Sequence, residues 1–300
     1  MHSRIRNIGQ WALRIAGALV MLLVVAVGVV YAASERRFRK HFEVPVHRVT
    51  VPTDSASVAR GEHLATIRGC TTCHGVGLAG HVEVDDPMLG RLAGPNLTNG
   101  GRGAALADAD WERAVRHGVR ADGAPLLIMP ASEHTGMSDE DLGALIAYAR
   151  SLPSALTVPP PSKAGPVLRG LFAAGMVLLL SAEEIDHTQP HPARVDAEPT
   201  PAYGGYLVAM CKVCHGPQLS GGKIPGGPPD WKPAANLTPA GIGHWTEADF
   251  INALRTGRRP DGSPIDTQMP WKSFGRMSDV ELRAIYAYLH AQPAREYGHR

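Results

Sequence analysis

The sequence predicts a mainly α-helical protein in which a transmembrane helix at the N-terminus precedes two tandem copies of one helical domain. Three observations lead to this fold class. An apolar run of 23 residues lies near the start, five short motifs recur at an offset of 139 to 141 residues, and helical periodicity accompanies the motifs at equivalent places in both copies. No run of residues predicts a convincing β-strand.

The apolar run covers residues 11–33, WALRIAGALVMLLVVAVGVVYAA. As a helix it would measure about 35 Å, enough to cross a hydrocarbon core of about 30 Å. A cleaved signal peptide is the alternative, with a passable cleavage site at 30–32, but the run exceeds the roughly 7–15 apolar residues of such peptides. We therefore expect an uncleaved anchor, with residues 1–10 on the cytoplasmic side and a linker at 34–54. Basic residues flank the run on both sides, so charge leaves the orientation open.

The composition is that of a folded chain with an uneven charge distribution. Its 300 residues accommodate about two domains. The first 40 residues carry a net charge of +6, and because the whole chain carries +2, the remaining residues carry −4. A mildly acidic body disfavours nucleic acid as a partner. The 33 glycines and 25 prolines predict much irregular backbone, which a fold wrapped around a rigid prosthetic group tolerates.

The repeat defines two domains, expected at residues 55–153 and 201–293, with a short tail at 294–300. A Pro-rich linker at 154–200 separates them. Within it, the hydrophobic segment 167–180 has 14 residues and contains Arg169; it is too short for a span and predicts a helix that packs on a domain or lies at an interface.

Each copy contains three predicted helices: one leads into a cysteine motif, a short one lies in the middle, and one closes the domain. The candidate N-caps of the middle helices are Asp108 and Thr246. The capping-box-like pairs that begin the last helices are Ser138 with Asp141 and Ser278 with Glu281.

Both copies contain a Cys-x-x-Cys pair followed directly by histidine, and these four cysteines are all that the chain has. The two sets are Cys70, Cys73 and His74, and Cys211, Cys214 and His215. The pattern is the attachment signature of c-type haem, in which two thiols bond to the vinyl groups and the histidine lies beneath the iron as its proximal ligand. A redox dithiol would need no histidine, and a zinc site would need both pairs together. The sequence therefore predicts two covalently bound haems c.

The iron of an electron-transfer haem needs a sixth ligand, and a methionine raises its potential. Met129 and Met269 precede proline, which favours an extended loop that can lay a thioether over the haem. Met137 and Met277 are the alternatives, although their place before a helix suits a core side chain.

Other candidate residues are weaker. Trp111 and Phe250 are aligned aromatic residues that we expect to pack beside the haems. Two alternatives are predicted for Arg116, Arg120, Arg255 and Arg259: they pair with haem propionates, or they are solvent-exposed charges at helix ends. Eight histidines have no counterpart in the other copy and are predicted as surface or structural residues: His63, His81, His117, His134, His187, His191, His244 and His290.

The order of the motifs resembles that of class I cytochrome c domains: CxxCH, a Pro-Asn-Leu-like turn, Met-Pro, and a last helix containing Ala-Tyr. The resemblance covers about two thirds of the chain. It implies that Met129 and Met269 are the distal ligands. It also implies that the carbonyl of Pro95 orients the proximal histidine, with Ala235 in its place in the second copy and with Asn96 and Asn236 in the same turns.

The pair of domains behind an anchor is similar to dihaem cytochromes c and to the cytochrome subunits of bacterial membrane-bound alcohol and gluconate dehydrogenases. This resemblance implies electron transfer from a dehydrogenase or quinol-oxidising complex to a terminal oxidase or soluble cytochrome. A haem subunit of a dehydrogenase complex is the related alternative. A dihaem peroxidase is a second one, which the Met-Pro step in both copies disfavours. Because bacterial c-type haem is attached outside the cytoplasmic membrane, we expect both domains in the periplasm or on the outer face.

Overall fold

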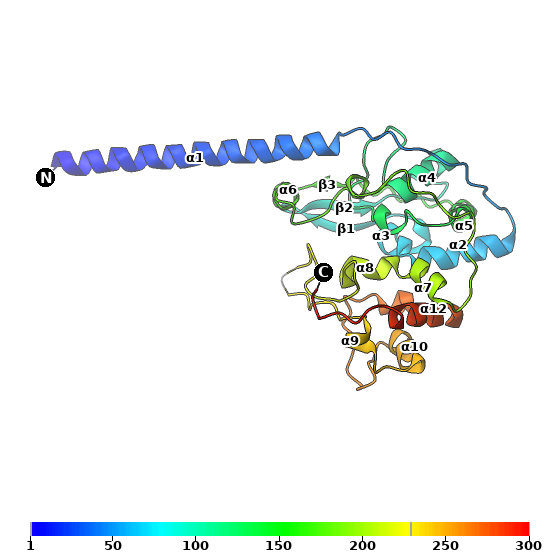
Figure 1. The fold of residues 1–300 in the computed structure, drawn as a ribbon. Helices are drawn as coiled ribbons and strands as arrows, with labels where there is room; N and C mark the ends of the chain where they lie inside the picture. The colour runs from blue at the N-terminus through cyan, green and yellow to red at the C-terminus, as the bar shows by residue number, and fades with distance from the viewer. Residues whose placement is uncertain (1, 229, 300) are drawn as a thin grey trace.

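The computed structural model describes residues 2–228 and 230–299; Met1 of the expected cytoplasmic segment and Arg300 of the expected tail lie outside the described residues. A long helix projects from two helical units that lie one on the other (Figure 1). This architecture confirms the predicted fold class. The α-helices are α1 (His2–Phe38), α2 (Ser55–Ile67), α3 (Cys70–His74), α4 (Asp108–His117), α5 (Asp139–Ser151), α6 (Pro166–Ala173), α7 (Pro201–Leu207), α8 (Ala209–His215), α9 (Pro239–Ile242), α10 (Glu247–Thr256), α11 (Trp271–Phe274) and α12 (Asp279–His290). Short 3₁₀ turns are η1 (Val76–Leu78), η2 (Arg102–Ala105), η3 (Ala131–Glu133) and η4 (Ser181–Glu183).

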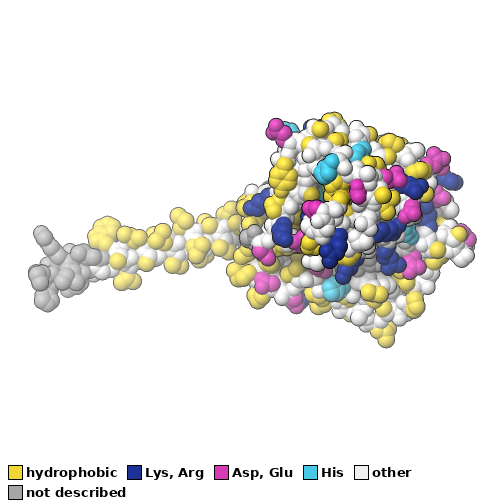
Figure 2. Space-filling view, turned by 90° about the horizontal axis from the view of Figure 1, so that it is seen from below, with side chains coloured by type: hydrophobic (Ala, Val, Ile, Leu, Met, Phe, Trp, Pro, Cys, Tyr) yellow, Lys and Arg dark blue, Asp and Glu magenta, His cyan; other side chains and the backbone are white. Residues whose placement is uncertain are grey.

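Helix α1 is the candidate membrane span, because Gly9–Phe38 is long and apolar enough to cross a bilayer. Its apolar side chains are exposed along the projecting part (Figure 2). The helix ends at Phe38, five residues beyond the expected limit at residue 33. The extension follows from packing on α6: the rings of Phe38 and Phe172 stack at 5.4 Å, and buried Arg169 donates to Ser34 at 2.8 Å.

Each unit is built on a crossing between its first and last helices, α2 with α5 and α7 with α12. Glycine makes both crossings possible. A Cβ placed on Gly61 would overlap the carbonyl oxygen of Ala144, and one placed on Gly204 would overlap that of Ala284. The same Gly-to-Ala contact in both units shows that the sequence repeat is a repeat of packing.

The helix starts follow the predictions with one exception. Ser138 and Ser278 cap α5 and α12, and Thr246 caps α10 by accepting from the amide of Asp249 at 3.1 Å. Asp108 is not an N-cap, contrary to the prediction, because it is the first helical residue of α4. The cap position holds Ala107, which has no side-chain acceptor.

The prediction that the chain lacks strands was wrong. Strands β1 (His81–Asp86), β2 (Gly90–Gly94) and β3 (Lys163–Ala164) form an antiparallel sheet in the order β1-β2-β3. The hairpin lies between the CxxCH helix and the Pro-Asn-Leu turn of the first unit, and β3 comes from the linker. The linker is therefore not loose throughout, since part of it completes this sheet.

The linker helix is shorter than predicted. We expected a helix over 167–180, but α6 ends at Ala173. Gly175 adopts a left-handed conformation (φ 69°), and the amides of Gly175 and Met176 donate to the carbonyls of Phe172 and Leu171 at 3.1 and 2.9 Å. This paired arrangement is a Schellman cap, which terminates a helix whatever the hydrophobicity of the following residues.

Candidate haem-binding sites

Each CxxCH motif forms a short helix, α3 or α8, that ends at its histidine. The Nδ1 atom of His74 lies 2.9 Å from the carbonyl oxygen of Pro95, and that of His215 lies 2.7 Å from the carbonyl oxygen of Ala235. Because a carbonyl only accepts, Nδ1 carries the proton in both rings, and Nε2 keeps the lone pair that a metal requires. Ala235 therefore gives the second site the same histidine orientation as Pro95 gives the first.

The turn that supplies this carbonyl is held by a buried asparagine in both copies. The Oδ1 atom of Asn96 accepts from the amide and hydroxyl of Thr98 at 2.9 and 2.7 Å, and Asn236 accepts from Thr238 at the same distances. The Nδ2 atom of each asparagine donates to the chain that follows the last helix of its domain, to the carbonyl of Ala155 in the first and of Arg295 in the second. The two asparagines thus lock the histidine-orienting turns.

A strained leucine recurs between each histidine and its turn, and no local pattern in the sequence predicts it. Leu78 (φ 52°) and Leu219 (φ 59°) both adopt left-handed backbone conformations, which a branched side chain rarely does. Their carbonyls accept from the amides of Leu97 and Leu237 at 2.8 Å. The strain therefore serves the turn that orients the histidine.

The cysteine thiols suit a tether and not a redox couple. Burial raises the pKa of Cys70 to about 11 and that of Cys211 to about 12. A reactive dithiol requires the opposite, a pKa lowered by nearby positive charge or a helix N-terminus. Burial likewise lowers the pKa of His74, which favours the neutral imidazole that ligates a metal.

The two pairs of methionines occupy different environments. Met137 and Met277 are 1% and 2% exposed and belong to the cores of their domains. Met129 and Met269 are half-buried and lie at the edge of the same cores, in the loops that precede η3 and α11. This difference favours Met129 and Met269 as the distal ligands, and their ligation stays a prediction.

The described residues fit a haem in the first domain. Trp111 packs in the same core as Cys70, yet its buried indole N–H has no hydrogen-bond partner within residues 2–228 and 230–299. Arg68, two residues before Cys70, is 3% exposed and leaves Nε and Nη2 unpartnered. Unpaired buried donors are rare in folded proteins, and haem propionates are suitable acceptors. Sequence reasoning missed Arg68. Phe250, the counterpart of Trp111, is buried in the second core.

The four arginines that could pair with propionates all bind protein groups. Arg116 is fully buried and donates to the carbonyl of Met137 and to Asp139, at 2.6 and 2.7 Å. Its counterpart Arg255 binds the carbonyl of Gly275 and Asp279. These two side chains tie the middle helix of each domain to the start of its last helix. Arg120 and Arg259 bind groups of their own turns, Asp122 in the first domain and Ser263 with the carbonyl of Pro264 in the second.

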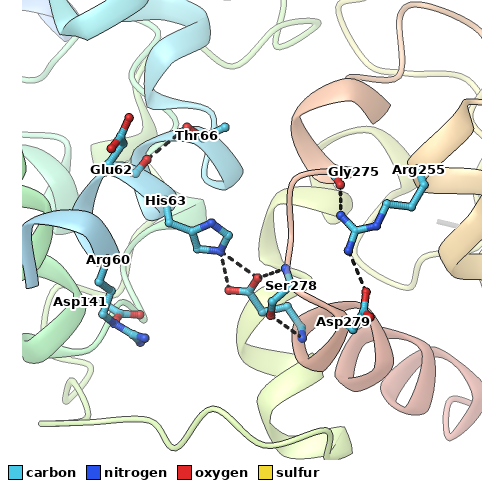
Figure 3. Close-up of polar contacts among 10 residues, drawn as sticks. Arg60, Glu62, His63, Thr66, Asp141, Arg255, Gly275, Ser278 and Asp279 are labelled. Carbon is cyan, nitrogen blue, oxygen red and sulfur yellow. Dashed lines mark hydrogen bonds and ion pairs between the residues drawn. The ribbon is translucent and has the colours of Figure 1, made fainter. Parts of the chain in front are cut away.

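The two domains share a polar interface, and Figure 3 shows the part of it in which His63 of the first domain points toward the start of the last helix of the second, near Ser278. The hydroxyl of Tyr206 donates to Asp141 at 2.6 Å, and Arg60 also binds this carboxylate. Asp141 therefore does not accept a hydrogen bond from the amide of Ser138, and the predicted capping box of α5 is only half formed. In the second domain the capping box of α12 is complete, because Glu281 accepts from the amide of Ser278 at 2.6 Å.

The ion pair of His63 with Glu281 joins the domains, with 2.8 Å between Nε2 and Oε2. Burial by itself would raise the pKa of Glu281, but the hydrogen bond and charge of His63, together with Ser278, hold it below its usual value. A lowered carboxyl pKa contributes stability that is complete above the ordinary value near 4.5 and is lost as the pH falls below it. The interface is thus weakened by acid.

Replacing Glu281 with glutamine should therefore destabilise the protein at pH 7 by about 1–2 kcal/mol, because glutamine keeps the capping box but not the charge. Thermal unfolding should show a midpoint lower than that of the wild type by roughly 4 °C or more at pH 7, and the difference should vanish as the pH falls below about 4.5. Glu62→Gln, an exposed change on α2, is the control and should have no effect. An equal loss at both pH values would contradict the role of the charge.

The loop of the first domain that contains Met129 leads into a turn that lies against the cysteine motif of the second domain. The turn η3, which directly follows Met129 and Pro130, packs on α8. An apolar cluster continues across the boundary and includes Leu64, Ile67 and Ala144 of the first domain with residues of the second. The two candidate haem-binding sites therefore lie in domains that pack directly against each other.

Comparisons with known proteins agree with this geometry. Residues 56–148 match the family described as cytochrome c oxidase, cbb3-type, subunit III, and residues 202–292 match the family described as cytochrome c. The two matches fall one on each repeat.

Three curated relatives, all cytochrome proteins, are similar to this sequence over most of its length. The fructose dehydrogenase cytochrome subunit of Gluconobacter japonicus is 29% identical over 82% of this chain and 55% of its own length. The alcohol dehydrogenase (quinone) cytochrome c subunit of Gluconacetobacter polyoxogenes is 31% identical over 81% and 58%. A diheme cytochrome c-type protein of Cereibacter sphaeroides is 27% identical over 81% and 88%. The chain thus spans less than two thirds of the length of the dehydrogenase subunits that it matches.

Proposed function

Because this chain is a dihaem cytochrome c that transfers electrons through two c-type haems, we propose that it is the electron-transfer subunit of a membrane-bound dehydrogenase. It accepts electrons from the dehydrogenase and passes them to a terminal oxidase or a soluble cytochrome. The observation that carries the proposal is the duplicated haem-binding site. His74 and His215 make the same hydrogen bond to a backbone carbonyl, and Met129 and Met269 lie in matching loops. Relatives named as fructose and alcohol dehydrogenase subunits support the dehydrogenase partner.

When bound, the haems supply the one-electron chemistry; the polypeptide holds them, sets their potentials and offers docking surfaces. The thioethers of Met129 and Met269 would raise both potentials. Contact between η3 and α8 keeps the two mounts adjacent, which favours transfer within one chain.

We further propose that α1 anchors the protein in the bacterial cytoplasmic membrane, with both haem domains on the outer face. Covalent haem attachment outside the membrane requires both CxxCH motifs there. The sequence V-Y-A, which resembles a cleavage site, lies inside α1, and the guanidinium of buried Arg169 sits 4.8 Å from the ring of Tyr31. Cleavage at this place would break a packed helix, which favours an uncleaved anchor.

The alternative is a dihaem peroxidase, which requires one haem with an open axial position and acid–base groups beside it. Carbon monoxide binding distinguishes an electron carrier from a peroxidase. Both reduced haems of a carrier are six-coordinate, so carbon monoxide should leave the absorption spectrum of the purified protein nearly unchanged. Rapid binding of carbon monoxide to one haem would favour the peroxidase.

The partner is tested in native membranes. Deletion of the gene should abolish oxygen uptake driven by one sugar or alcohol substrate, and the protein purified under mild detergent should carry the corresponding dehydrogenase with it. A deletion strain that oxidises every such substrate at the wild-type rate would rule out the proposed partner while leaving the haem chemistry intact.

A further inference from the structure

A cluster of two histidines and a glutamate lies on the first domain, apart from the haem mounts. Glu112 and His117 belong to α4, and His191 belongs to the linker between the domains. One ligand atom from each of the three residues lies within 4.8 Å of the other two. Glu112 and His117 are 0% exposed, so the cluster is built into the protein and is not a surface coincidence.

Five polar side-chain atoms of this cluster have no hydrogen-bond partner among the residues that the structure describes. They are both carboxylate oxygens of Glu112, Nε2 of His117, and both ring nitrogens of His191. Glu112 Oε1 lies 3.5 Å from Nε2 of His117 and 3.7 Å from Nη1 of Arg116, and neither contact is a hydrogen bond. The Arg116 guanidinium offsets part of the charge of this buried carboxylate, but neither oxygen accepts a hydrogen bond from the described residues, so both keep the capacity to bind a cation.

A hydrogen-bonded chain of imidazoles fixes the tautomer of His117. Nε2 of His187 lies 3.0 Å from the carbonyl oxygen of Ala182, so it donates and leaves the lone pair of the neutral ring on Nδ1. Nδ1 of His117, 3.0 Å from that atom, must then donate to it. The Nε2 atom of His117 is left with a lone pair that points toward Glu112. Metal-bound histidines typically donate their second nitrogen in this way.

We propose that Glu112, His117 and His191 bind a divalent transition-metal ion, with Zn²⁺ as the best fit. Two imidazoles and a carboxylate are a common zinc ligand set, and tetrahedral bonds of about 2.0–2.1 Å place ligand atoms about 3.3 Å apart. The 3.5 Å between His117 Nε2 and Glu112 Oε1 already approaches that spacing. His191 would supply the third ligand from a ring nitrogen that lies within 4.8 Å of the other two ligand atoms.

The site belongs to the first domain alone, which separates it from the duplicated haem chemistry. The equivalent positions on α10 hold Ile251 and Thr256, which lack such ligand atoms. The metal would pin the linker to α4, close to where the amide of Asp139 already donates to the carbonyl of Pro192 at 3.0 Å. Its role is thus to fix the linker that leads to the second domain.

The test measures zinc against the iron of the two haems. The full chain is purified in detergent with a tag that contains no histidine, dialysed against a chelator, and equilibrated with micromolar Zn²⁺. Elemental analysis should then give one zinc for every two irons. The His191→Ala and Glu112→Gln variants should bind almost none, and His187→Ala should bind roughly 10–100-fold more weakly because it loses only the supporting hydrogen bond.

The control is His244→Ala, which removes an exposed histidine of the second domain and should keep the full zinc content. Each variant must retain two irons per chain, which shows that it still folds and receives haem. His191 lies in a linker, so its removal leaves the domain core intact. Absence of zinc from the wild type, or equal zinc in the wild type and His191→Ala, would overturn the proposal.

Discussion

Replacing Met129 with alanine should lower the reduction potential of one haem by about 0.1–0.3 V and leave the other nearly unchanged, within the roughly 0.8 V range that axial ligands command. The thioether stabilises the ferrous state, and its loss leaves a position that water or hydroxide can occupy. Because Met129 lies at the edge of the first core, truncation opens the distal side without removing a fully buried side chain. The reduced variant should also gain rapid carbon monoxide binding at one haem.

A spectroelectrochemical titration of the purified protein measures both potentials at once. Met269→Ala should shift the other haem in the same direction, which assigns the two waves to their domains. Met137→Leu is the matched control, because this methionine is 1% exposed and a volume-conserving core substitution costs less than about 1.5 kcal/mol. If Met137→Leu lowers a potential and Met129→Ala does not, then the ligand assignment is wrong.

The sequence repeat predicted the elements of the fold that both copies share. Periodicity and capping pairs located α5 and α12, and the apolar residues that lead into the CxxCH motifs located α2 and α7, because each of these signals depends on neighbouring residues alone. Among the described residues, the hairpin of β1 and β2 occurs only in the first copy, and β3 of the linker pairs with its second strand. The pairing of β2 with β3 joins Gly90 to Ala164, which are far apart in the sequence, and pairing of this kind leaves no local signal.

The residues of the candidate sites also fall into two groups, those that the sequence predicted and those that only the folded structure shows. The histidines, cysteines and candidate methionines were found from their spacing, whereas Arg68 and the strained Leu78 and Leu219 depend on tertiary context. The proposed metal cluster was missed for a related reason. His191 lies in a linker with no periodicity, 74 residues from His117, and each histidine taken singly resembles a surface residue. Only the folded chain brings their unpartnered atoms together.

Gly61→Ala should destabilise the first domain by about 3 kcal/mol or more, although alanine at an exposed helix position would stabilise by about 1 kcal/mol. The added Cβ would overlap the backbone oxygen of Ala144, which cannot rotate away as a side chain can. Helix α2 must therefore separate from α5, and this opens the core around Leu64 and Ile67 that continues into the second domain. The predicted change in sign distinguishes a packing constraint from helix propensity.

Thermal unfolding followed by circular dichroism should show a midpoint lower by more than roughly 10 °C, together with a reduced yield of protein carrying both haems. Gly170→Ala on α6 is the matched control, because a Cβ there meets nothing within 4 Å, and it should be neutral or slightly stabilising. Gly204→Ala should reproduce the loss in the second domain through Ala284. A Gly61→Ala protein as stable as the wild type would mean that α2 and α5 do not cross at this contact, and the packing repeat on which both haem mounts rest would need revision.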